Sequence, residues 1–125
     1  MGRIDQEIEI LRSRYPDVRL RDPWVLIPAY PVPSVGWSVS AVAVAFLIPG
    51  GYPGAKPYAF HVSPPLRVGN AVPTNSTESH EPVFPGVWQK FSWGCPEWAP
   101  GTEPRSGTNL LHWALSFRER LREYS

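Results

Sequence analysis

The chain has a single cysteine, Cys95, among its 125 residues, and this excludes an internal disulfide. A zinc site needs three or four ligands, and three scattered histidines beside one cysteine have no ligand spacing. We therefore expect no metal and no cofactor. A chain so poor in cysteine is typical of a reducing compartment, which predicts a cytoplasmic location.

Long hydrophobic runs and an excess of one charge are also missing. The longest apolar stretch, "AVAVAFLI", is far shorter than the ~20 residues that cross a bilayer, and the charged start, "MGRIDQEIEI", is unlike a signal peptide. The net charge is +1, whereas phosphate binding needs a basic excess. We expect neither a membrane nor a nucleic acid as a partner.

Proline is absent from both ends of the chain but abundant between them. All 16 prolines lie between Pro16 and Pro104. Because proline is excluded from helix interiors and central strands, helices are expected at the two ends, with strands and loops in the middle. The length and the 42% hydrophobic content favour one globular domain over residues 1–125.

Apolar residues recur at helical spacing at both ends. The first set is Ile4, Ile8, Leu11 and Tyr15, and the second is Leu110, Trp113, Phe117, Leu121 and Tyr124. Pro16 disfavours helical geometry in the residue before it, and Thr108 or Asn109 can cap the second helix. The sequence predicts helices over residues 4–15 and about 108–123.

Four segments between these helices read as strands, "DVRLRDPWVLIPAY", "VSAVAVAFLI", "YAFHV" and "VWQKFSW". In the second, Val42, Val44, Phe46 and Ile48 alternate with alanines, so both faces are expected to be covered. Residues 69–86 have no period, and long irregular loops of this kind are often functional. Consecutive strands predict an α+β fold in which a four-stranded antiparallel meander is flanked by the two helices.

The segment "IPGGYPGAKP" resembles the proline-tyrosine-proline signature of ubiquitin-conjugating enzymes, and its residues are Pro49, Tyr52, Pro53 and Pro57. That family also has a Trp-x-Pro before its C-terminal helices, which Trp98 and Pro100 match here. The helix–meander–helix order agrees as well. The chain is therefore similar to the bacterial branch of this family, which implies its fold and, as partners, a ubiquitin-like protein and an activating enzyme.

The sequence departs from the family at its active site. The His-Pro-Asn tripeptide is absent, and Cys95 precedes Trp98 by three residues, where the eukaryotic spacing is roughly eight. The resemblance implies that Cys95 accepts the ubiquitin-like protein as a thioester. A small side chain packed at a strand end is the other interpretation of Cys95.

Among the histidines, His80 lies in the long loop and could replace the missing asparagine as a proton acceptor or oxyanion partner. A solvated loop histidine is its alternative interpretation. His61 and His112 fall within a predicted strand and a predicted helix, and both are expected to be structural.

Arg3, Arg12 and Arg14 lie off the apolar stripe of the first helix. The resemblance implies that this helix meets the activating enzyme, although a merely solvated face explains the arginines equally well. Three hypotheses remain open. The chain is a conjugating carrier acting through Cys95 and His80, an inactive binding module of the same fold, or an unrelated α+β scaffold.

Overall fold

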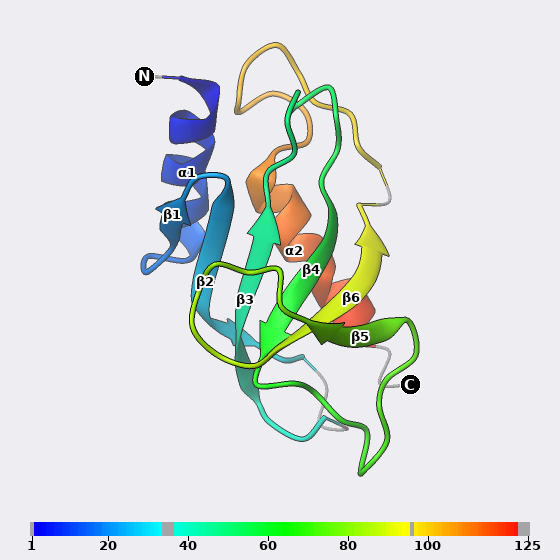
Figure 1. Ribbon diagram of the computed structural model, residues 1–125. Coiled ribbons are helices and arrows are strands. Elements are labelled where there is room, and N and C mark those ends of the chain that lie inside the picture. The colour runs from blue at the N-terminus through cyan, green and yellow to red at the C-terminus, as the bar shows by residue number, and fades with distance from the viewer. Residues whose placement is uncertain (1, 34–36, 96, 123–125) are drawn as a thin grey trace.

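The computed structural model describes residues 2–33, 37–95 and 97–122. Two helices enclose a series of strands along the chain (Figure 1). The elements are α1 (Arg3–Arg14), β1 (Arg19–Arg21), β2 (Trp24–Pro31), β3 (Ala41–Leu47), β4 (Tyr58–Ser63), β5 (Ser76–Ser79), β6 (Trp88–Gly94) and α2 (Leu110–Leu121). The prediction of an α+β fold with a helix near each end is confirmed.

All strands join one antiparallel sheet in the order β1-β2-β3-β4-β6-β5. The sheet has six strands, so the predicted four-stranded meander is wrong in its strand count. The chain forms a simple meander only as far as β4. From there it passes through β5, at the sheet edge, before β6 pairs with β4.

The two additional strands are short: β1 lies inside the first predicted extended segment, where it was not separated from β2, and β5 was not predicted. The three residues of β1 show no inward-facing apolar set, and β5 has the sequence "STES" within the predicted irregular loop. An alternating pattern marks a strand only when one face is buried in a core. These segments form strands because their backbones pair with β2 and β6. Backbone pairing does not require apolar side chains, so the composition of the two segments does not reveal it.

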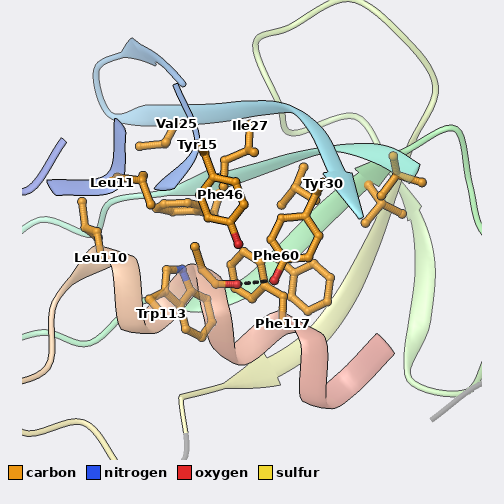
Figure 2. Close-up of a cluster of buried hydrophobic side chains, with 14 of the residues drawn as sticks. Leu11, Tyr15, Val25, Ile27, Tyr30, Phe46, Phe60, Leu110, Trp113 and Phe117 are labelled. Carbon is orange, nitrogen blue, oxygen red and sulfur yellow. Dashed lines mark hydrogen bonds between the residues drawn. The ribbon is translucent and has the colours of Figure 1, made fainter. Parts of the chain in front are cut away.

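The main core lies between the sheet and the two helices. Phe60 stacks on Phe117 of α2, with 4.3 Å between ring centroids, and Trp113 meets Phe117 edge to face. The hydroxyl of Tyr30 on β2 donates a 2.5 Å hydrogen bond to the carbonyl oxygen of Ala114 (Figure 2). These contacts fix α2 against β2 and β4, and α2 carries most of the side chains of the candidate site.

The opposite face of the sheet is covered only in part, although the alanine pattern of β3 predicted full cover: Ala45 is buried, whereas Ala41 and Leu47 are exposed. Trp24, Ala45 and Trp88 form a second buried cluster, with Phe84 packed against it. Residues 80–87 pass in front of β2 and β3, on the face turned away from α2 (Figure 1). Arg21 donates to the carbonyl oxygen of Val83 at 3.4 Å and helps to hold this loop in place.

A buried carboxylate, Glu7, connects α1 to two distant segments. Glu7 is fully buried and accepts hydrogen bonds from the Tyr52 hydroxyl, from the backbone N–H of Leu110 at 2.7 Å, and from Arg3 Nε at 2.8 Å. A buried charge is stable only when it is paired and hydrogen-bonded. Glu7 therefore fixes α1 both to the turn at Tyr52 and to the first residue of α2.

Candidate functional site

The two sequence signatures contact each other although 45 residues separate them. The indole N–H of Trp98 donates a 2.9 Å hydrogen bond to the carbonyl oxygen of Pro53, and the Trp98 and Tyr52 rings lie 5.6 Å apart. Pro57 is buried, and the carbonyl oxygen of Pro49 accepts from Tyr52 N–H at 3.1 Å. The motif residues thus form one packed unit that supports the segment between β6 and α2.

Pro100 belongs to the same segment. It forms an isolated antiparallel bridge with Gly107, which has a φ of +78°, and a Cβ on Gly107 would lie 2.4 Å from the carbonyl oxygen of Ala99. No other residue type fits this close approach. The bridge folds residues 100–107 back on themselves, so the chain enters α2 close to the point where it left β6.

Cys95 directly follows β6 and lines an open surface pocket of about 540 Å³. The other residues of this pocket, called here the Cys95 pocket, are Glu97, Thr108, His112, Leu115, Ser116 and Glu119. Residues 112, 115, 116 and 119 share one face of α2, because neighbours on a helix surface are three or four residues apart, and Thr108 lies just before the helix. The pocket therefore lies between the end of β6 and one face of α2.

The cysteine itself lies at the margin between core and surface. Its exposed fraction is 8%, and it contacts the main core cluster while lining the open pocket. Burial raises the pKa of the Cys95 thiol, and the Glu119 carboxylate acts in the same direction. The Glu97 backbone and the Ser116 side chain, together with the charge of Lys56, oppose that rise and lower the pKa of the thiol.

The Ser116 hydroxyl is held in place by two hydrogen bonds. It donates to the carbonyl oxygen of Trp113 at 2.6 Å and accepts from the indole N–H of Trp93 at 3.1 Å. These bonds fix the position of the hydroxyl beside Cys95, whose pKa it lowers.

His112 lies in the first turn of α2, where it takes part in a capping box. The side chain of Asn109 accepts from His112 N–H at 3.1 Å, and the backbone N–H of Asn109 donates to His112 Nδ1 at 3.3 Å. Sequence reasoning assigned His112 a structural role, and the cap is such a role. His112 also lines the Cys95 pocket, which only the docking of α2 could reveal.

The structure does not bring His80 to Cys95. His80 follows Ser79, which pairs with Trp88 at the start of β6, whereas Cys95 comes after the end of β6. Seven strand residues span roughly 20 Å. The His80 side chain is 90% exposed and lies 3.8 Å from Glu78, which matches the interpretation of a solvated loop histidine.

The three arginines of α1 differ in their availability. Arg3 is held by Glu7 and by the carbonyl oxygen of Gly101, each at 2.8 Å. Arg12 and Arg14 are exposed; Arg12 pairs loosely with Glu9 at 3.6 Å, and the Arg14 guanidinium lies over the Tyr15 ring. Of the three, Arg12 and Arg14 are the ones whose charge faces solvent.

The described residues offer neither a cluster of metal ligands nor a helix suited to a membrane. No cluster of three or more histidine, cysteine, aspartate or glutamate side chains in residues 2–33, 37–95 and 97–122 could hold a metal ion. Within the same ranges, neither helix has the length and apolar character that crossing a membrane requires.

Comparison with known proteins places the chain in a family. No curated protein and no solved structure matches it. A family model described as prokaryotic E2 family E matches residues 10–116, a range that includes both signatures, Cys95 and His112. E2 proteins are the ubiquitin-conjugating class, so the match agrees with the resemblance read from Tyr52, Pro53 and Trp98. The chain belongs to prokaryotic E2 family E.

Proposed function

We propose that this chain carries a ubiquitin-like protein as a thioester on Cys95 and transfers it to an acceptor. The protein would receive its cargo from an activating enzyme, since E2 proteins work with such enzymes and with ubiquitin-like proteins as a class. Cys95 is the only residue of the chain with a thiol, and a thiolate is the nucleophile that forms a thioester.

The observation that carries this proposal is the position of Cys95 in the open pocket between β6 and α2. A thioester on a protein tail needs a nucleophile that a chain end can reach. Burial on one side keeps the sulfur in one place, and the open pocket on the other side leaves room for an extended tail. A cysteine closed within the core would offer no such access.

The exposed charges on α1 support a second part of the proposal. Arg12 and Arg14 face solvent, while Arg3 is engaged with Glu7. We propose that Arg12 and Arg14 contribute to docking of the activating enzyme, and that Arg3 mainly stabilises α1. Exposed charges act chiefly on the rate of encounter.

The test of carrier activity is direct. The protein is incubated with its activating enzyme, ATP and the ubiquitin-like protein, with and without a thiol reductant. A reductant-sensitive adduct is expected for the wild type and none for Cys95→Ala. Cys95→Ser should give a reductant-resistant adduct, because an alkoxide is a poorer leaving group than a thiolate. A reductant-sensitive adduct on Cys95→Ala would contradict the proposal.

A catalytically inactive binding module is the second candidate. The small exposed fraction of Cys95 and its raised thiol pKa favour this candidate, because a buried thiol is a poor nucleophile. Such a module would bind the ubiquitin-like protein or its activating enzyme with unchanged affinity after Cys95→Ala. It would form no covalent adduct under any condition.

A further inference from the structure

The two ring nitrogens of His112 differ in their hydrogen bonding. Nδ1 accepts the backbone N–H of Asn109 at 3.3 Å, as part of the cap of α2. Nε2 makes no hydrogen bond to any of the described residues, and the His112 side chain is exposed where it lines the Cys95 pocket. One nitrogen is thus committed to the fold, while the other has no hydrogen-bond partner among the described residues.

This arrangement selects one tautomer of the neutral ring. A neutral imidazole has one nitrogen that donates and one that accepts. Because Nδ1 must accept the Asn109 N–H, the proton of the neutral ring lies on Nε2. Neutral His112, which lines the Cys95 pocket, therefore has an unused hydrogen-bond donor at Nε2, whereas its accepting nitrogen is occupied by the Asn109 N–H.

Attack on a thioester needs such a donor. The carbonyl oxygen becomes an oxyanion when a nucleophile adds to the carbon, and a fixed donor stabilises that charge. The tripeptide whose asparagine supports this attack in the eukaryotic enzymes is missing here. His80, the replacement suggested by sequence, lies beside the opposite end of β6 from Cys95.

We infer that the Nε2–H of His112 donates a hydrogen bond to the acyl oxygen of the thioester on Cys95 and stabilises the oxyanion during transfer. This inference rests on the proposed carrier function and adds a catalytic residue to it. His112 keeps its proton throughout, so its role is electrostatic and it does not act as a general base.

In both loading and discharge of the thioester, every bond formed is matched by a bond broken, and His112 neither gains nor loses a proton. In loading, the Cys95 thiolate attacks the carbonyl carbon of the activating enzyme's thioester, a new C–S bond forms, and that enzyme's thiolate leaves with the electron pair. In discharge, an amine attacks the same carbon, a C–N bond forms, and the C–Sγ bond breaks. The electron pair returns to sulfur, and the proton released by the amine passes to solvent or to the thiolate. His112 stabilises the oxyanion of each intermediate.

Three substitutions of His112 distinguish the hydrogen-bond donor at Nε2 from the helix-capping role of Nδ1. His112→Gln keeps both, because the amide oxygen of glutamine can accept the Asn109 N–H and its amide nitrogen can donate. His112→Glu keeps the cap and loses the donor at neutral pH. His112→Ala loses both without adding charge, so it shows whether the new charge of glutamate explains any effect. Circular dichroism melting verifies that each variant is folded.

The experiment needs no identified partner. Each protein is acylated on Cys95 with an acetyl-Gly-Gly thioester of mercaptoethanesulfonate, which releases the small thiol. After desalting, hydroxylamine discharges the acyl group as a hydroxamate, and intact-mass spectrometry follows the loss. We expect His112→Gln to discharge near the wild-type rate, and His112→Ala and His112→Glu to be slower by about tenfold or more.

The other outcomes are equally informative. Wild-type rates in all three variants would limit His112 to its capping role and overturn the inference while leaving the carrier function intact. A His112→Gln rate as low as that of His112→Ala would assign a proton-accepting role and overturn the donor role. Failure of folded wild-type Cys95 to acylate, where the unfolded chain does acylate, would overturn the proposed function and the inference together.

Discussion

The indole N–H of Trp98 donates a 2.9 Å hydrogen bond to the carbonyl oxygen of Pro53. This bond joins the turn after β3 to the segment that leads from Cys95 to α2. Neither residue carries chemistry. Their contact helps to fix the irregular residues between β6 and α2. The shape of the Cys95 pocket therefore depends on a hydrogen bond that lies outside the pocket.

Trp98→Phe should lower the free energy of unfolding by about 1–2 kcal/mol, because the Pro53 carbonyl oxygen loses its donor while most ring packing on Tyr52 is kept. Urea unfolding measures the change. Tyr58→Phe is the control, since Tyr58 is 61% exposed, and it should stay within about 0.5 kcal/mol of the wild type. Equal losses of unfolding free energy in the two variants would show that the Trp98–Pro53 hydrogen bond does not contribute to stability.

Glu7 should be among the most sensitive charged positions of the chain. Glu7→Ala leaves Arg3, the Tyr52 hydroxyl and the Leu110 N–H without their acceptor, and breaking a buried pair in this way costs about 3–5 kcal/mol. Glu7→Gln retains an oxygen acceptor, so its loss should be smaller. Denaturant unfolding compares both with Glu9→Ala, an exposed control that should change stability little.

His61 should make stability fall on acidification. Burial lowers the pKa of His61, and the partly opposing effect of Glu81 does not reverse this. Below the ordinary histidine pKa of about 6.5 the unfolded chain binds a proton that the folded chain does not, so stability declines as the pH falls.

Urea midpoints at pH 7.5 and 5.5 test this prediction for His61. His61→Phe should reduce the difference between the two midpoints, whereas His80→Gln should leave it unchanged because the His80 side chain is 90% exposed. The Glu81 carboxylate, whose pKa is lowered chiefly by Lys90, loses its contribution only at lower pH. A wild-type midpoint that does not fall at pH 5.5 would contradict the assignment.

Ser116 should control the reactivity of Cys95. Burial raises the pKa of the thiol and the Ser116 hydroxyl lowers it, so Ser116→Ala should move the pH midpoint of alkylation by iodoacetamide upward. The alkylation rate at pH 7.5 should fall accordingly, because the thiolate is the reacting form. Ser92→Ala, an exposed change on β6, is the matched control. An unchanged midpoint would leave Ser116 with a packing role only.

Charge reversal at Arg12 and Arg14 should slow association with the activating enzyme by about tenfold at low salt, with the difference shrinking as salt is added. Folding should change little, since both side chains are exposed. Stopped-flow binding and thermal melting measure the two effects. Arg118→Glu, at an exposed arginine of α2, serves as the control. If binding rates stay equal, the arginines of α1 form only a solvated surface.

The sequence by itself determined the terminal helices and the central strand. Apolar spacing at Ile8 and Leu11, and proline confined between residues 16 and 104, predicted helices near both ends. The alternation of valine and alanine in β3 predicted cover on both faces, and the second face is covered at Ala45 but exposed at Ala41 and Leu47. The signatures at Tyr52 and Trp98 also led to the E2 family. All these signals are local, because each depends on neighbours within a few residues.

Only the tertiary structure decided the rest. The edge position of β5 depends on pairing with β6, and its polar residues carry no core-facing pattern. Glu7 is satisfied in the interior by Arg3 on its own helix and by Tyr52 and Leu110, which reach it from 45 and 103 residues away. Cys95 shares its pocket with His112, and not with His80, because α2 docks beside the end of β6. Contacts of this kind arise from packing between segments that are distant in the sequence, so they cannot be predicted from local sequence patterns.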